Sequence, residues 1–162
     1  MKIIGIDPGI ARIGWAVIET KGYEPNALAF GCITTDQKDT PQYRLHAIHT
    51  SLSEIFKKYS PDIMSIEDLF FGTNTTTAFV VGQARGVILL IAEEHHIPAV
   101  SYTPLAVKRA ICGDGQADKK QILYMVMKIF KLTKPPKPDD TADAMAIAAT
   151  HAYSYKMKGK TI

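Results

Sequence analysis

No apolar run in this 162-residue sequence approaches the roughly 20 residues that a helix needs to cross a bilayer. The first residues also lack the basic lead, apolar centre and small-residue cleavage site of a signal peptide. Cysteine is scarce: Cys32 and Cys112 stand alone, without the paired spacing of zinc sites. Because isolated thiols suit a reducing compartment, we expect a cytoplasmic protein without structural zinc.

Internal repeats, low-complexity linkers and a GxxxxGK[ST] phosphate-binding loop are absent as well. The chain is also too short for the two-domain cleft of an actin-like ATPase, which disfavours that class. A hydrophobic fraction of 46% and a charged fraction of 22% suit one globular unit. We expect a single domain over residues 1–155 and a basic, flexible tail over residues 156–162.

Charge is unevenly distributed along the chain. The net charge is +3, but residues 101–162 hold 11 basic against 5 acidic residues, whereas residues 1–100 have an acidic excess. A basic half suits a polyanion such as nucleic acid. A lysine-rich face in contact with solvent explains the same numbers equally well, so charge alone leaves both interpretations open.

Hydrophobic periodicity and turn residues predict five strands and five helices. Three strands in succession indicate an antiparallel meander, and the later alternation of helix and strand indicates crossover connections. The expected fold is α/β, a mixed five-stranded sheet with helices on both faces. Strands are expected over residues 2–7, 13–19, 26–35, 62–67 and 98–103, and helices over 41–59, 75–96, 104–113, 118–132 and from about 139 onward.

Four carboxylates occupy unusual places in this pattern. Asp7 and Glu67 each end an apolar strand. Asp140 and Asp143 lie three apart at the start of a small, apolar helix, and residues three apart share one helix face. A carboxylate at the tip of a buried strand is costly unless it is paired or binds a cation. Since α/β sheets place their chemistry at carboxyl strand ends, we expect all four to converge on one site.

Oxygen ligands without a His or Cys partner favour Mg²⁺, with Mn²⁺ able to substitute. Two such ions, about 3.5–4 Å apart, would activate a water and stabilise the leaving oxygen in a phosphoryl displacement, and Asp7 is expected to bridge them. Singly, each acid has a structural explanation: Asp7 can begin a turn, and Asp140 can cap the last helix. We assign the cap to Asp139 instead, because Asp140 keeps the spacing to Asp143.

Six ordered motifs resemble those of the RuvC family of bacterial Holliday-junction resolvases, over roughly residues 2–152. They are Ile4-Gly5-Ile6-Asp7-Pro8-Gly9 with Gly14, Ile66-Glu67 followed by Phe70, Gly82-Gln83-Ala84-Arg85-Gly86, Val107-Lys108, Gly115-x-Ala117-Asp118-Lys119, and Asp140-x-x-Asp143-Ala144.

This resemblance implies an RNase H-like fold and a homodimer that nicks two opposed strands of four-way junction DNA with Mg²⁺, in DNA recombination and repair. It also implies contact with the RuvA and RuvB branch-migration helicase complex. The catalytic and metal-binding roles fall on the four acids, which are Asp7, Glu67, Asp140 and Asp143.

The resemblance also makes Phe70 a wedge that stacks on an unpaired base, whereas its pairing with Phe71 would otherwise indicate core packing. No role is assigned to Phe71. Arg85 either supports a neighbouring carboxylate or contacts DNA. Basic side chains expected to contact DNA phosphates are Lys108, Lys119, Arg12 and Arg85.

Two related interpretations and one interface stay open. The first strand and its turn are also similar to the YqgF family, which would favour an RNA substrate, although the Phe70 loop and the motif over 82–86 favour the resolvase. A junction-binding protein without catalysis is disfavoured by the four intact acids. The helix over 75–96 is the candidate dimer interface, although packing against its own sheet explains its apolar residues equally well.

Overall fold

The structure is a computed structural model that describes residues 1–22, 24–68 and 75–158. Within those residues, one sheet has the strand order β3-β2-β1-β4-β5. The strands are β1 (Lys2–Asp7), β2 (Arg12–Lys21), β3 (Glu24–Thr34), β4 (Ile63–Glu67) and β5 (Ala99–Tyr102). The helices are α1 (Pro41–Tyr59), α2 (Thr75–Glu94), α3 (Pro104–Cys112), α4 (Lys119–Ile129) and α5 (Asp139–Lys158).

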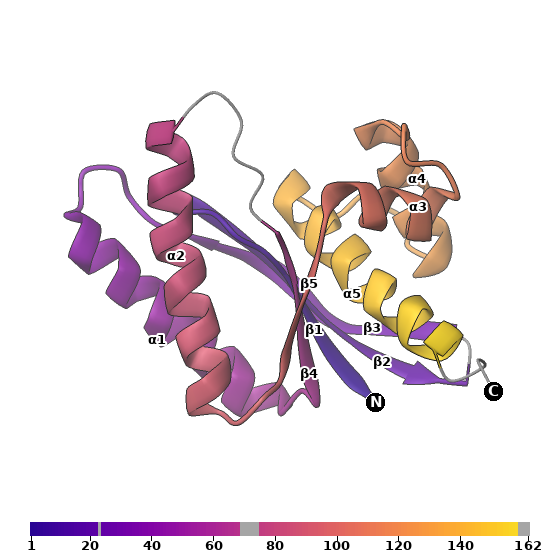
Figure 1. The fold of residues 1–162 in the computed structure, drawn as a ribbon, viewed down its shortest axis with the longest axis horizontal. Helices are drawn as coiled ribbons and strands as arrows, with labels where there is room; N and C mark the ends of the chain where they lie inside the picture. The colour runs from indigo at the N-terminus through magenta and orange to yellow at the C-terminus, as the bar shows by residue number, and fades with distance from the viewer. Residues whose placement is uncertain (23, 69–74, 159–162) are drawn as a thin grey trace.

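The sheet is mixed, as predicted. β1, β2 and β3 form an antiparallel meander, whereas β4 runs parallel to β1 and β5 runs parallel to β4. Figure 1 shows α1 and α2 on one face of the sheet and α5 on the other, with α3 and α4 beyond α5. The predicted α/β fold, a five-stranded sheet with helices on both faces, is therefore confirmed.

Alternation of side chains along each strand divides the core into two layers. On β1, Ile3 packs in the layer that contains α5, whereas Ile4 and Ile6 pack in the layer that contains α1 and α2. Since alternate residues share a face, Gly5 and Asp7 project towards α5 together with Ile3. The strand pattern thus directs its terminal carboxylate to one particular face of the sheet.

Two glycines bring α5 into close contact with the sheet. A Cβ atom on Gly5 would overlap the carbonyl oxygen of Ala144, and one on Gly14 would overlap that of Asp140. A larger residue at either position would force the helix away. Because Asp7 on β1 is the register partner of Gly14 on β2, this contact sets the first turn of α5 beside Asp7.

The fourth helix is shorter than predicted. Asp118 caps α4, since its side chain accepts a hydrogen bond from the Gln121 backbone N–H and the Gln121 side chain bonds back to the Asp118 backbone. The helix ends at Ile129 rather than at residue 132. Lys131 has a φ of 52°, which lies in the left-handed region and interrupts the right-handed helix.

The last helix overlaps the first residues of the segment 156–162, for which a basic, flexible tail stays a prediction. It reaches Lys158, past Tyr155, where the sequence placed the start of a flexible tail. Ala152 is buried and Tyr153 packs against the same core, so packing in this layer continues as far as Tyr153. At the other end, Asp139 is the first helical residue and not the cap before it. Among the described helices, none has the length and apolar content to span a bilayer.

Replacing Gly14 with Ala should lower the free energy of unfolding by about 1–3 kcal/mol, because the added methyl group would meet the α5 backbone. Gly31→Ala, in the same sheet, is the matched control. Its methyl group would lie 3.1 Å from the Trp15 side chain and would meet no backbone atom that closely, so we expect a smaller loss, below about 1 kcal/mol. Urea denaturation measures both, and equal losses would contradict the proposed close contact.

Candidate active site

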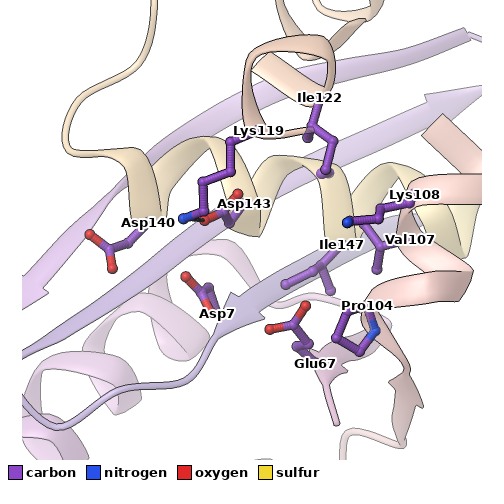
Figure 2. A pocket seen from close by; sticks show the side chains of 11 residues that line it. Asp7, Glu67, Pro104, Val107, Lys108, Lys119, Ile122, Asp140, Asp143 and Ile147 are labelled. Carbon is purple, nitrogen blue, oxygen red and sulfur yellow. Dashed lines mark hydrogen bonds and ion pairs between the residues drawn. The ribbon is translucent and has the colours of Figure 1, made fainter. Parts of the chain in front are cut away.

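Four acidic side chains from three elements line one pocket of about 390 Å³. Asp7 and Glu67 end two neighbouring parallel strands, which are in register at Ile6 and Ile66, so these strand ends lie side by side. Asp140 and Asp143 come from the first turns of α5. In Figure 2 these turns of the helix pass over the ends of the two strands.

Two lysines and an apolar wall complete the pocket. Lys119 is the first residue of α4, and Lys108 lies on α3, so both bring positive charge to the acids (Figure 2). Val107, Ile122 and Ile147 are among the apolar lining residues. Apolar neighbours of this kind lower the local dielectric constant, which strengthens the electrostatic interactions among the acids.

Ion pairs occupy two of the carboxylates. Lys119 Nζ lies 3.4 Å from Asp143 Oδ2, and Arg12 Nε lies 3.2 Å from Asp140 Oδ2. In Figure 2 the Asp140 carboxylate points away from Glu67, with Asp7 between them. Throughout the described part of the chain, no three acidic, His or Cys side chains are close enough to hold one metal ion. The four acids therefore share a pocket without forming a finished ligand set.

The pocket strongly disfavours negative charge on Asp7. Burial raises the pKa of Asp7 to about 8, and the nearby Asp143, Glu67 and Asp140 contribute to the rise, while Lys119 opposes them. A carboxyl group with such a pKa holds its proton at neutral pH in the metal-free protein. An added cation would stabilise its ionised form, which is the form that binds metal.

The pocket also disfavours negative charge on Glu67 and Asp143. Burial raises the pKa of Glu67, with a further contribution from Asp143. Burial also raises the pKa of Asp143, although the ion pair with Lys119 lowers it in part. In return, Asp143 raises the pKa of Lys119, so this lysine stays charged. A set of buried oxygen donors that repel one another fits a hard divalent cation.

Arg85 lies outside the acidic pocket, where it supports a neighbouring carboxylate. Its Nη2 donates to Asp68 Oδ1 at 3.1 Å and to Ser101 Oγ at 2.7 Å. This geometry favours the first of the two roles that the sequence left open. The expectations for Phe70 and Phe71 concern residues 69–74, which lie outside the described residues.

Two neighbours of the site were missed by the sequence analysis. Asp68 follows Glu67 directly, and only the fold reveals that Arg85 fixes it. Cys32 is the register partner of Gly14, and burial, with Asp140 nearby, raises the pKa of its thiol. Strand pairing is the signal that would have located Cys32, but the sequence alone does not specify the register.

A mixed sheet of this order, with acids at the adjoining ends of β1 and β4 beneath the start of a helix, defines an RNase H-like nuclease fold. A family model described as crossover junction endodeoxyribonuclease RuvC matches residues 3–151. The chain belongs to the RuvC family, whose members are endonucleases and depend in general on a metal ion.

Individual relatives are similar to this chain over almost its whole length. The RuvC protein of Halothermothrix orenii is 46% identical over 160 residues, covering 99% of this chain and 97% of the relative. That of Brevibacillus brevis is 47% identical over 152 residues, covering 94% and 92%. Thermus thermophilus RuvC, solved in complex with a Holliday junction substrate, superposes with a TM-score of 0.93 at 34% identity, covering 98% and 96%.

More distant structures share the fold only. The yeast mitochondrial Holliday junction resolvase Ydc2 has a TM-score of 0.71 at 14% identity, and the match covers 98% of this chain and 80% of that one. At that identity the likeness concerns the arrangement of the sheet and helices.

Replacing Asp7 with Asn should stabilise the metal-free protein, and more so at higher pH. The folded chain keeps a proton on Asp7 up to about pH 8, whereas the unfolded chain releases it near the ordinary value of 3.8. The wild type therefore loses stability relative to the variant as the pH rises through this window, by at most about 1.4 kcal/mol per pH unit.

Thermal unfolding in a chelator at about pH 5 and about pH 8 measures this difference. Glu54→Gln removes an exposed carboxylate from α1 and serves as the control, with little expected change in melting temperature at either pH. A gain for Asp7→Asn that is no larger at the higher pH would argue against the strained, protonated Asp7.

Proposed function

We propose that this protein is a metal-dependent endonuclease that resolves four-way DNA junctions by paired nicks in opposed strands, in DNA recombination and repair. The observation that carries the proposal is the pocket shared by four acids at the end of an RNase H-like sheet. Membership of the RuvC family, and similarity to a resolvase bound to a Holliday junction, support this substrate. A chromosomal DNA substrate also favours a cytoplasmic location.

The donor chemistry of the pocket supports Mg²⁺ as the cofactor, with Mn²⁺ as a substitute. We assign all four carboxylates as ligands of two ions, and Asp7, which lies centrally among them in Figure 2, as the bridging ligand. When bound, the ions would activate a water and neutralise charge on the scissile phosphate. The ligand set is Asp7, Glu67, Asp140 and Asp143.

The basic residues around the pocket hold the DNA backbone. Lys108 and Lys119 line the pocket and place positive charge where a phosphate would enter, so they stabilise the charge that develops during cleavage. The Arg12 side chain is 58% exposed, and it lies beside Asp140 at the edge of the site. There it is available to contact the phosphate backbone of the DNA. The wedge role of Phe70 and a direct DNA contact by Arg85 stay predictions, the latter less favoured because Arg85 is engaged with Asp68.

Paired nicking requires two active sites in a fixed relation, which a two-fold dimer supplies. The outer face of α2 supports this assignment, because it exposes large apolar side chains: Phe79 is 68% exposed and Leu90 is 53% exposed. Gly86 lies between them, and a Cβ atom placed on it would meet nothing within 4 Å beyond its own helix, so a second backbone can approach there. Association with the RuvA and RuvB helicase complex is proposed from family membership.

Asp7→Asn should bind a synthetic four-way junction yet fail to nick it, because one ligand loses its charge while the basic surface is unchanged. Nicking should fall by at least about 100-fold, whereas the junction Kd, measured by gel shift in a chelator, should change less than about threefold. Asp62→Asn, at the opposite end of the sheet, where Asp62 accepts a hydrogen bond from the Lys2 backbone N–H, is the control that should nick normally. Undiminished nicking by Asp7→Asn would reject the proposed site.

The substrate is tested by offering a mobile four-way junction, the matching duplex and a single-stranded RNA to the wild type with Mg²⁺. We expect paired nicks in opposed strands of the junction only, mapped on all four labelled strands. Preferential cleavage of the RNA would favour the YqgF-like alternative, and binding without nicking would favour the non-catalytic one.

Phe79→Glu should convert the dimer to a monomer, because it places a charge in the centre of the proposed apolar interface. Sedimentation equilibrium measures the mass, and labelled junctions show whether the second nick still accompanies the first. Tyr124→Glu, on α4 at 60% exposure, is the control that should remain dimeric. A Phe79→Glu protein that stays dimeric would place the interface elsewhere.

A further inference from the structure

Arg12 lies between the acidic pocket and solvent. Its side chain is 58% exposed, and its Nε lies 3.2 Å from Oδ2 of Asp140, a side chain that is 24% exposed. Arg12 and Gly14 are two residues apart on β2, so they share the face that carries α5. The same strand therefore contacts Asp140 twice. Gly14 packs against its backbone, and Arg12 forms an ion pair with its side chain.

The contact holds Asp140 in a position unsuited to sharing a cation with the other acids. Its Oδ2 is buried, and within the described residues it has no hydrogen bond of good geometry, so Arg12 is its compensating charge. The carboxylate points away from Glu67 in Figure 2. Because the ion pair with Arg12 offsets the negative charge of this carboxylate, Arg12 and a divalent ion in the pocket compete for Asp140.

Arg12 also has an alternative partner of its own. A guanidinium offers five N–H donors in a plane, a geometry that matches phosphate oxygens as well as carboxylates. More than half of the Arg12 side chain faces solvent at the rim of the pocket, where the DNA backbone would arrive. Lys119, 78% exposed and 3.4 Å from Asp143, repeats the arrangement on the other acid of α5.

We propose that Arg12 is a positioning residue that holds Asp140 away from the metal site until a DNA phosphate takes over its guanidinium. Junction binding and metal binding then strengthen each other, and by linkage each changes the affinity of the other by the same factor. The inference rests on the proposed function and adds to it an order of assembly. Without DNA the site binds metal weakly. With DNA bound, Asp140 becomes available as the fourth carboxylate ligand.

The first test measures Mn²⁺ binding to the DNA-free protein, by electron paramagnetic resonance of the unbound ion. Arg12→Gln should lower the Mn²⁺ Kd about three- to fivefold, because the competing cation is gone. Arg12→Lys, which keeps the charge, should restore most of the wild-type Kd. Circular dichroism confirms that each variant is folded, as expected for an exposed position.

Lys108→Gln is the matched control, because it removes one positive charge from the lining of the neighbouring pocket, and no acid forms an ion pair with Lys108 in the described chain. We expect it to lower the Mn²⁺ Kd by less than about twofold. An equal effect of Lys108→Gln and Arg12→Gln would show a general electrostatic effect and overturn the positioning role.

The second test measures the coupling itself in a Glu67→Gln background, chosen to prevent cleavage. Saturating junction DNA should lower the Mn²⁺ Kd about three- to fivefold in Glu67→Gln and leave it unchanged in the Arg12→Gln, Glu67→Gln double variant, after correction for Mn²⁺ bound by DNA alone. Full coupling without Arg12 would overturn the inference. A wild type that nicks junctions but fails these tests rejects the positioning role alone, whereas one that neither binds Mn²⁺ nor nicks also rejects the proposed function.

Discussion

The close contact of α5 with β1 and β2 is the constraint on which the site depends. At Gly5 and Gly14 the backbone of the helix lies where any side chain would stand, so its first turn cannot move without opening the core. Alternation along β1 and β4 aims Asp7 and Glu67 at this same turn. Acids from opposite ends of the sequence thus meet because two positions in the sheet carry no side chain.

Such a meeting is energetically unfavourable without cations. A rise of one pKa unit corresponds to about 1.4 kcal/mol, and the pKa of Asp7 rises from 3.8 to about 8. The two basic partners are largely exposed, and exposed ion pairs contribute only about 0.2–1 kcal/mol each. Arg12 and Lys119 therefore offset a small part of the repulsion. The remainder favours binding of divalent ions, so the fold stores in its charged pocket part of the free energy that metal binding releases.

Local sequence patterns predicted most of the strands and helices, but they did not predict the contacts within the site. Short apolar runs located the strands that end in Asp7 and Glu67, and the three-residue spacing put Asp140 and Asp143 on one face. The end of α4 was misjudged, because a left-handed backbone conformation at Lys131 interrupts the helix and no local pattern specifies it. The start of α5 was misjudged by one residue, because Asp139 is helical and not the cap. Pairing of Arg12 with Asp140 depends on the docking of α5, a long-range contact that no local pattern encodes.

The pocket and the proposed dimer surface lie on opposite faces of the sheet. The pocket lies on the α5 face, whereas α2, which carries the proposed dimer surface, lies on the other (Figure 1). β4 connects the two, because Glu67 enters the pocket while the next residue, Asp68, is held by Arg85 of α2 at 3.1 Å. This ion pair, with the arginine side chain 20% exposed and the aspartate side chain 42% exposed, connects α2 to the strand end that carries a pocket acid. The helix that carries the proposed dimer surface and the acid that lines the pocket are therefore joined at one strand end, because Asp68 directly follows Glu67.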